Sequence, residues 1–369
     1  MNNPLALCEL AARTPNISAG HKVKQTQGKT DMIKLTDEQM AGQRLMVGFD
    51  GTDLSTDVKF LIKDLHVGGL ILFTRNIVTP EQVRHLCLSS QKYARSCGEP
   101  ALFIAVDQEG GTVARMKSPF TEFSGNAAMK GREDAVAFAR ISAKELQDVG
   151  INMNMAPVLD VAIDPRASIM KDRAFGSDPE WVSRLGMAVI HHLQEGGVMS
   201  VAKHFPGIGR TTLDSHLDLP FLETSAEDIA AIDLAPFQDA IKKGVAGMML
   251  SHICYRSLDD QRPASLSKKI ARDLLRHRLG YDGVVMTDDL DMGAIKKHHD
   301  LQASMQQILA ADIDIALICH RSPDMETAFE TVRSFQSMSP ANRRLGEQSV
   351  RRIMALKKDY LAEEKRFKF

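Results

Sequence analysis

The sequence predicts an α/β protein with a single (β/α)8 TIM barrel, and three observations support this. From about residue 40 onward, short β-branched or aliphatic runs alternate with longer helical patterns, which is typical of a parallel sheet with crossover helices. Eight such runs are present, and eight units would overfill an ordinary doubly wound sheet but fit a barrel. No Pro/Gly/Ser-rich linker interrupts residues 40–365, so one domain is the simpler prediction.

The eight predicted strands are short apolar runs that end in polar or turn-forming residues. They are QRLMVGF near 43–49, GGLILF near 68–73, LFIAVD near 102–107, INMNMAPVLD near 151–160, VMSVAKHF near 198–205, VAGMMLSH near 245–252, GVVMTD near 283–288 and IDIALIC near 313–319. Residues 36–369 would form this barrel. The polar, turn-rich stretch 25–30 indicates that residues 1–35 form a flexible N-terminal extension.

Helical stretches with recognisable ends lie between these strands. Pro80 suits the first helical position of the stretch 80–94. Ser225, followed three residues later by an aspartate, resembles a capping box at the start of 225–244. A last helix at about 341–363, of mixed charge, is expected to close the outer ring.

Charge balance and cysteine usage exclude several classes of protein. Charged side chains make up 25% of the 369 residues and the formal net charge is -1, so the basic surplus of a nucleic-acid binder is missing and a small or neutral partner is indicated. The five cysteines are odd in number and lack CxxC spacing, which favours buried thiols in a reducing cytoplasm over disulfides or zinc. No run has the roughly 18 apolar residues of a membrane span, and no signal-peptide pattern is present. We therefore expect a soluble, cytoplasmic monomer without metal or cofactor.

Ionisable side chains follow several of the predicted strands. They are Asp107 at the end of the third strand, Lys203 and His204 at the fifth, His252 at the sixth and Asp288 at the seventh. Reactive groups of barrel enzymes lie where strands end and βα loops begin. A single such residue could equally be a helix cap or part of an ion pair at the rim. Several convergent polar ends favour a functional site at the barrel mouth, in which His252 would play a supporting part.

Three carboxylates compete for one role near the seventh strand, namely Asp288, Asp289 and Asp291. Strand alternation places Asp288 on the face of Val284 and Met286, and Asp289 on the opposite face. Either face could be the lumenal one, and we favour the face that carries Asp288. A carboxylate held against the anomeric carbon of a sugar can form a covalent glycosyl intermediate, the step that a retaining glycosidase needs.

The loop after the fifth strand contains glycines, a proline and then the triplet Asp214, Ser215 and His216, so this loop can move. A carboxylate beside an imidazole raises the pKa of the imidazole and fixes its tautomer. Asp214 and His216 could therefore donate a proton to a leaving oxygen and later accept one from water. From the triplet alone, a turn that carries a surface histidine is the more common explanation.

Six segments together resemble glycoside hydrolase family 3, in its β-N-acetylglucosaminidase branch. They are VDQEGG at 106–111, NMAPVLDV at 154–161, DRAFGSDP at 172–179, KHFPGIG at 203–209, DSH at 214–216 and MTDDLDMGA at 286–294. The resemblance covers residues 36–360. KHFPG followed by DSH is its most specific part, because DSH separates this branch from the β-glucosidases of the same family. Those β-glucosidases take a glutamate acid/base from a second domain, whereas this sequence ends soon after its eighth strand.

The resemblance implies a retaining β-N-acetylhexosaminidase. Asp288, the first aspartate of the TDD motif, corresponds to the nucleophile. His216 corresponds to the proton donor and acceptor, with Asp214 as its partner. The residues that correspond to those holding the terminal N-acetylglucosamine are Asp107, Arg115, Arg173, Lys203 and His204. Charged groups form strong hydrogen bonds to hydroxyls and reject sugars that leave them unpaired.

Two positions depart from the family pattern. Ile208 stands where many relatives have histidine, and Thr112 stands where they often have arginine. Neither is among the residues carried over, so these departures bear on the leaving group more than on the reaction. The implied substrate is a cell-wall fragment from peptidoglycan recycling, N-acetylglucosamine β-1,4-linked to 1,6-anhydro-N-acetylmuramic acid.

Three other classes stay open at this point. A glycoside phosphorylase would use phosphate in place of water in the second step, since a neutral imidazole repels an anion less than a glutamate does. A metal-dependent barrel hydrolase would also place histidine and aspartate at strand ends, but the first strand has no HxH pattern. A non-catalytic sugar-binding module would need neither a nucleophile nor an acid/base.

Overall fold

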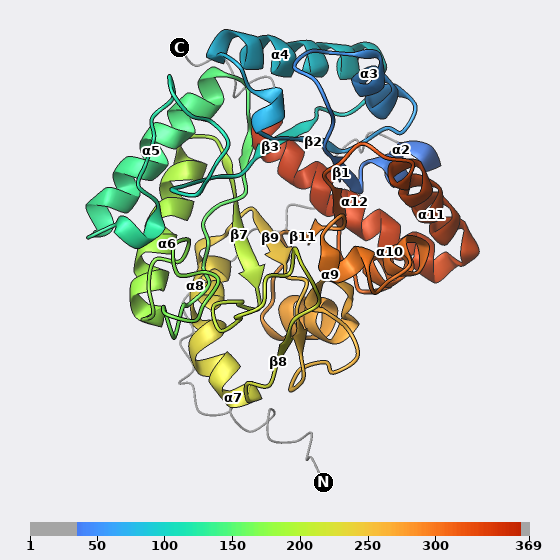
Figure 1. Cartoon of the computed structure of the whole chain (residues 1–369). Coiled ribbons are helices and arrows are strands. Elements are labelled where there is room, and N and C mark those ends of the chain that lie inside the picture. The colour runs from blue at the N-terminus through green and yellow to red at the C-terminus, as the bar shows by residue number, and fades with distance from the viewer. Residues whose placement is uncertain (1–34, 363–369) are drawn as a thin grey trace, which may run out of the picture.

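Eight parallel strands close on themselves in the computed structural model, which describes residues 35–362 (Figure 1). The order around the barrel is β1-β12-β11-β9-β7-β6-β3-β2. The strands are β1 (Leu45–Val47), β2 (Gly69–Leu72), β3 (Phe103–Val106), β6 (Met153–Asn154), β7 (Met199–Phe205), β9 (Gly247–Leu250), β11 (Val284–Asp289) and β12 (Ile315–Ile318). The predicted barrel is therefore confirmed, and each strand falls within or next to its predicted run.

Helices follow the strands and wrap the barrel (Figure 1). The longer ones are α2 (Asp37–Gly42), α3 (Thr56–Lys63), α4 (Pro80–Ser96), α5 (Arg132–Asp148), α6 (Pro179–Glu195), α8 (Ala235–Lys243), η6 (Lys269–Arg278), α10 (Leu301–Ala310), α11 (Asp324–Met338) and α12 (Pro340–Leu361). The shorter ones are η2 (Thr74–Asn76), η3 (Asn126–Ala128), α7 (Ala226–Asp228), η4 (Ile229–Asp233), η5 (Ala264–Leu266) and α9 (Gly293–Lys296). Pro80 opens α4 as predicted, and the Ser225 hydroxyl caps α7 by accepting the N–H of Asp228 at 3.0 Å.

Two small sheets tie loops together at the carboxyl side of the barrel. β4 (Gln108–Gly110) pairs antiparallel with β5 (Val113–Ala114) just after β3. β8 (Phe221–Leu222) pairs with β10 (Cys254–Tyr255) and so joins the loop after β7 to the loop after β9. The far end of the loop that carries the Asp-Ser-His triplet is therefore anchored.

Alternate strand residues fill the inside of the barrel. Val284 and Met286 belong to this inner cluster, whereas Val285 packs in the larger cluster between strands and helices. Val284 and Met286 therefore lie on the lumenal face of β11, whereas the register between β11 and β12 shifts between Met286 and Asp289, so alternation alone does not place Asp288. Methionine side chains fill irregular space well because they are unbranched and flexible. Those of the inner cluster are Met46, Met153, Met155, Met199, Met249 and Met286.

Helix α12 differs from its prediction, because it covers the amino-terminal end of the barrel as well as joining the outer ring. Its Ile353 and Leu361 belong to the inner cluster. The ammonium of Lys357 donates to the carbonyl of Gly68 at 2.9 Å and to Gln43 Oε1 at 2.5 Å. Both acceptors precede barrel strands, so α12 plugs the end opposite the predicted site.

The predicted strand at 151–160 is shorter than expected, because β6 spans Met153–Asn154 and is continued only by a single bridge between Val158 and Lys203. Pro157 lies between these two parts and has no N–H for the ladder. None of the described helices is both long and apolar enough to cross a membrane. Nearly all of the predicted N-terminal extension, residues 1–34, lies outside the described residues.

Stability is expected to rise with pH between about 7 and 10 because of Lys357. Burial lowers the pKa of Lys357 to about 7, against the opposing effect of Glu99. Unfolding restores a pKa of about 10.4, so in this window the unfolded chain binds more protons and each pH unit adds up to ~1.4 kcal/mol to the free energy of unfolding. Urea unfolding at several pH values measures the slope. Lys357→Met should flatten it and Lys358→Met, an exposed neighbour, should not; equal slopes would contradict the assignment.

Candidate active site

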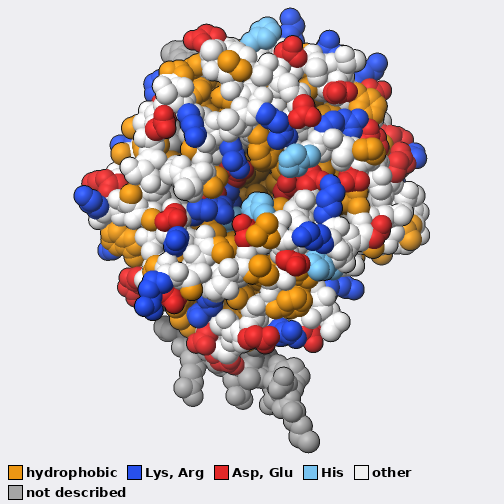
Figure 2. Space-filling view, viewed as in Figure 1, with side chains coloured by type: hydrophobic (Ala, Val, Ile, Leu, Met, Phe, Trp, Pro, Cys, Tyr) orange, Lys and Arg blue, Asp and Glu red, His pale blue; other side chains and the backbone are white. Residues whose placement is uncertain are grey.

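The side chains predicted from strand ends converge at the carboxyl side of the barrel. Asp107 follows β3, Lys203 and His204 are near the end of β7, and Asp288 lies in β11. Arg173 comes from the loop between β6 and α6. The face seen in Figure 2 carries acidic, basic and histidine side chains around a hollow near its centre.

Five side chains at this end of the barrel form one network of ion pairs. The ammonium of Lys203 lies 2.6 Å from Asp107 Oδ1 and 2.7 Å from Glu109 Oε1. Arg173 donates to both carboxylate oxygens of Glu109, at 3.0 and 2.7 Å. Arg115 lies 3.5 Å from the second oxygen of Asp107. Two carboxylates thus meet two strongly held cations, with a third cation at the edge.

Burial and charge oppose each other in this network, and charge prevails. Burial alone would raise the pKa of Asp107, but the nearby ammonium of Lys203 and guanidinium of Arg115 lower it to about 2. The pKa of Glu109 is also lowered, because Lys203 and Arg173 outweigh its burial. Asp107, Glu109, Lys203 and Arg173 therefore stay charged at neutral pH, and they can offer charged donors and acceptors to a bound sugar.

His204 is held by a carboxylate that the sequence analysis did not single out. Asp160 is fully buried and accepts from the backbone N–H groups of His204 and Ile208, at 3.3 and 2.8 Å. Its second oxygen lies 2.8 Å from Nδ1 of the His204 ring. With Nδ1 engaged by Asp160, Nε2 is the nitrogen left to face Arg173, 3.5 Å away, and the site.

Asp288 is half-buried beside two histidine rings. Burial alone would raise the pKa of Asp288, but His204, His252, the backbone N–H of Asp289 at 2.8 Å and Lys203 together leave it lowered. His252 is itself fixed, with Nε2 2.8 Å from the carbonyl of Asp289 and Nδ1 2.6 Å from the hydroxyl of Ser265. His252 was expected to support the site, and its hydrogen bond to the carbonyl of Asp289 holds the segment that contains Asp288.

The other two carboxylates of this segment are engaged elsewhere. Asp289 Oδ1 accepts from the backbone of Asp291 and Cys319, and burial raises the pKa of Asp289 to about 6. Asp291 pairs with Lys296 at 2.9 Å. Asp289 and Asp291 are thus committed to partners of their own, and Asp288 stays the candidate nucleophile of this segment.

Two groups among the described residues have metal-ligand spacing, Asp289 with Asp291 and His320, and the triplet His191, His192 and Glu195 on α6. The first group borders the mouth, but Lys296 already neutralises Asp291. His204, His216 and His252, the rings that could be mistaken for metal ligands, belong to neither of these two groups.

Asp214 and His216 contact each other on the loop after β7. Asp214 Oδ1 lies 2.8 Å from Nδ1 of His216 and accepts the backbone N–H of His216 at 2.9 Å. The two side chains are 47% and 66% exposed. Within residues 35–362, no hydrogen bond or ion pair joins this pair to the Lys203 network or to Asp288. The predicted pairing is present, and the charge of Arg173 is close enough to contribute to the lowered pKa of Asp214.

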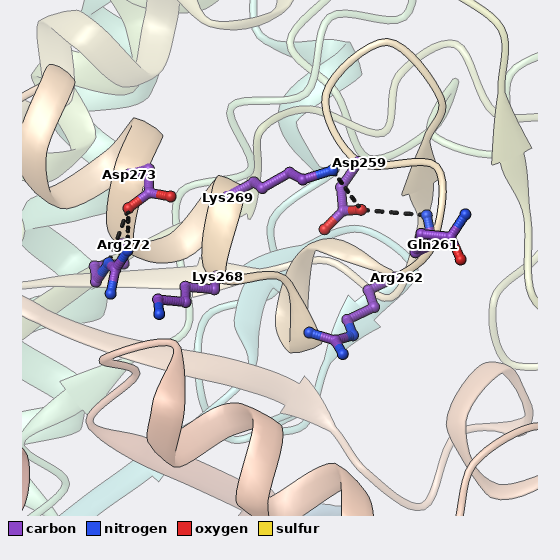
Figure 3. A pocket seen from close by; sticks show the side chains of 7 residues that line it. All are labelled: Asp259, Gln261, Arg262, Lys268, Lys269, Arg272 and Asp273. Atoms are coloured by element: carbon purple, nitrogen blue, oxygen red, sulfur yellow. Dashed lines mark hydrogen bonds and ion pairs between the residues drawn. The ribbon is translucent and has the colours of Figure 1, made fainter. Parts of the chain in front are cut away.

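A separate cavity of about 570 Å³ lies on the segment 259–273, away from every predicted site residue. Its lining is charged, as Figure 3 shows, but Lys269 reaches toward Asp259 and Arg272 pairs with Asp273. This cavity contains no nucleophile beside a general base, so the strand ends remain the candidate active site.

Glu109 and Asp160 are the functional-site residues that the sequence analysis missed. Both stood inside segments already noted, VDQEGG and NMAPVLDV. The available signal was position, since Asp160 ends the predicted run 151–160 just as Asp107 ends the run 102–107, and Glu109 lies two residues beyond Asp107.

Comparison with known proteins gives consistent matches. Residues 35–356 match the family described as "Glycosyl hydrolase family 3 N terminal domain". The Beta-hexosaminidase A of Pseudoalteromonas piscicida is 37% identical over 322 residues, and the Beta-hexosaminidase of Pseudomonas aeruginosa (strain LESB58) is 34% identical over 301 residues. The matches cover 78% and 80% of this chain. The chain spans 54% of the Pseudoalteromonas relative and 88% of the Pseudomonas relative.

Solved structures agree with these relatives. A glycoside hydrolase family 3 beta-N-acetylglucosaminidase from Paenibacillus sp. str. FPU-7 superposes with a TM-score of 0.85 at 37% identity, covering 88% of this chain and 62% of that one. The Beta-N-acetylhexosaminidase from Beutenbergia cavernae DSM 12333 has a TM-score of 0.81 at 29% identity, covering 88% of this chain and 99% of that one.

Glu109→Gln is expected to lower the free energy of unfolding by about 3–5 kcal/mol, because it leaves two buried or half-buried cations short of a carboxylate. Urea unfolding at pH 7 measures the loss. Glu81→Gln, which removes an exposed carboxylate on α4, serves as the control and should change little. Equal free energies of unfolding for the two variants would show that the ion pairs of Glu109 do not stabilise the fold.

Proposed function

Because the chain belongs to glycosyl hydrolase family 3, we propose that it is a retaining β-N-acetylhexosaminidase with Asp288 as its nucleophile. The observation that carries this proposal is the environment of Asp288 in β11, where His204, His252 and the backbone N–H of Asp289, 2.8 Å from Oδ1, leave its pKa lowered. The names of the relatives, β-hexosaminidase and β-N-acetylglucosaminidase, support a terminal β-linked N-acetylhexosamine, N-acetylglucosamine above all, as the sugar that is released.

In the first step, His216 donates a proton to the glycosidic oxygen while an Asp288 oxygen attacks the anomeric carbon. The bond between that carbon and the leaving oxygen breaks, and the aglycone departs as a neutral alcohol. The sugar is then an ester of Asp288, and His216 is neutral. Asp214 holds Nδ1 of His216, which leaves Nε2 to carry the proton.

In the second step, neutral His216 removes a proton from water, and the water oxygen attacks the anomeric carbon. The ester bond to Asp288 breaks and the carboxylate is restored, so the β configuration is retained after two inversions. A neutral imidazole suits this role because it adds no negative charge beside Asp288, whereas a deprotonated glutamate would repel it.

The charged network supplies the contacts that hold the sugar. We assign the hydroxyl contacts of the terminal N-acetylglucosamine to Asp107, Arg115, Arg173, Lys203 and His204. Because these groups are already paired and buried or half-buried, they are fixed before the sugar arrives and need little reordering on binding.

We assign the activity to the cytoplasm and to cell-wall fragments in which N-acetylglucosamine is linked to 1,6-anhydro-N-acetylmuramic acid. The resemblance noted in the sequence supports the substrate. The cysteines support the compartment, because Cys87, Cys97, Cys254 and Cys319 are all free thiols, as a reducing environment requires.

Trapping of the covalent intermediate is the test of the nucleophile. A fluorinated N-acetylglucosaminide with a good leaving group should add one glycosyl group to the protein, and peptide mass spectrometry should locate it on Asp288. Asp288→Asn should not be labelled, and its turnover of aryl N-acetylglucosaminides should fall to background while its melting temperature is kept. A label on Asp289 or Asp291 would refute the assignment.

The dependence of product formation on phosphate concentration distinguishes hydrolysis from phosphorolysis. If water is the acceptor, product formation stays constant as phosphate is raised to millimolar levels and free N-acetylglucosamine is the product. Appearance of N-acetylglucosamine 1-phosphate would make the protein a phosphorylase with the same nucleophile.

A further inference from the structure

Four consecutive residues of the loop after β7 contact one short segment that follows the nucleophile. The carbonyls of Ser215 and His216 accept the backbone N–H groups of Ala294 and Gly293, at 3.0 and 3.2 Å. The carbonyl of Leu217 accepts from the ammonium of Lys297 at 2.7 Å. The carboxylate of Asp218 pairs with the ring of His298. We call this set of contacts the loop dock.

The N-terminal end of α9 (Gly293–Lys296) provides the first two contacts of the loop dock. The first N–H groups of a helix have no partner within the helix and need acceptors from elsewhere. In this protein the acceptors are the carbonyls of Ser215 and His216. α9 itself begins five residues after Asp288, so the loop is held by the same stretch of chain that carries the nucleophile.

Gly293 is required for space at this contact. A Cβ at this position would lie 2.6 Å from the carbonyl oxygen of His216 and 2.9 Å from that of Leu217. The φ of Gly293 is not positive, so its backbone conformation suits alanine as well. Any side chain at this position therefore pushes the loop away and leaves the rest of the backbone unstrained.

We propose that Gly293, Lys297 and His298 are positioning residues that set the acid/base loop relative to the nucleophile. This inference rests on the proposed function of Asp288 and His216. A general acid works only within hydrogen-bond reach of the leaving oxygen. The loop dock bonds the backbone of His216 to the chain segment that follows Asp288. It therefore fixes the distance between the proposed acid/base and the proposed nucleophile.

Leaving-group dependence separates a positioning role from a structural one. A departing phenol of high pKa needs protonation, whereas 2,4-dinitrophenolate leaves without it. In Gly293→Ala, kcat/KM for phenyl β-N-acetylglucosaminide should fall roughly 10- to 100-fold, part of the 10²–10⁴ that general acid catalysis contributes. For the 2,4-dinitrophenyl glycoside it should change by less than about 3-fold, because the acid contributes little to that substrate.

Controls keep the outcomes distinct. Gly131→Ala is the matched glycine variant, since a Cβ there meets nothing within 4 Å and its φ is −167°, and it should resemble wild type. Lys297→Met tests the loop dock at an exposed position, with a smaller loss of the same pattern, while Lys242→Met on α8 should show none. Melting temperatures verify that each variant is folded.

The two proposals fail in different ways. If His216→Ala shows no leaving-group-dependent loss, the proposed acid/base is wrong. If His216→Ala shows that loss but Gly293→Ala and Lys297→Met match wild type, lose activity equally on both substrates or gain activity, the loop dock does not position the loop.

Discussion

The structure depends on charge balance at the carboxyl end of β3 and β7. Lys203 and Glu109 are buried, and Asp107 and Arg173 keep only 14% and 21% of their side chains exposed. An unpaired charge in such a place costs several kcal/mol, and the cost is tolerable only when opposite charges meet with good geometry. Two carboxylates against two cations satisfy this condition. A polar sugar site can therefore sit directly on a barrel interior that is filled by methionines.

Buried charged side chains lie at both ends of the barrel, and their surroundings differ. At the carboxyl end, neighbouring opposite charges keep every member of the network ionised. At the amino end, Lys357 has only neutral hydrogen-bond acceptors, and burial lowers its pKa to about 7. Other charges at the amino end are paired, because Arg276 and Arg352 lie 2.6 and 2.8 Å from the buried carboxylate of Asp314, so Lys357 is the exception there.

The proposed division of labour follows from where the two reactive groups lie. Asp288 belongs to a strand, so its position is tied to the barrel, and the rings beside it favour its charged form. His216 lies on an exposed loop, where an imidazole can exchange protons with water and a leaving group can depart. The loop dock connects the two groups, because it bonds the exposed loop of His216 to the chain segment that follows β11.

Sequence reasoning found the eight strands, because local hydrophobic periodicity encodes them, but the periodicity of β11 separated two faces without saying which one is lumenal. Membership of family 3 was also visible in linear motifs. Glu109 and Asp160 escaped because their importance lies in partners far along the chain, Arg173 and His204. The plugging position of α12 and the contacts between 215–218 and 293–298 are likewise tertiary, and periodicity within one segment does not encode them.

The stereochemistry of the first product tests the central claim most directly, since it reports whether the anomeric carbon is inverted twice, as a covalent route through Asp288 requires, or only once. Proton NMR of an aryl β-N-acetylglucosaminide during its first turnovers should show the β anomer of N-acetylglucosamine before mutarotation begins, as two displacements at Asp288 require. Initial appearance of the α anomer would mean that water attacks the anomeric carbon directly, and Asp288 would then not be a nucleophile.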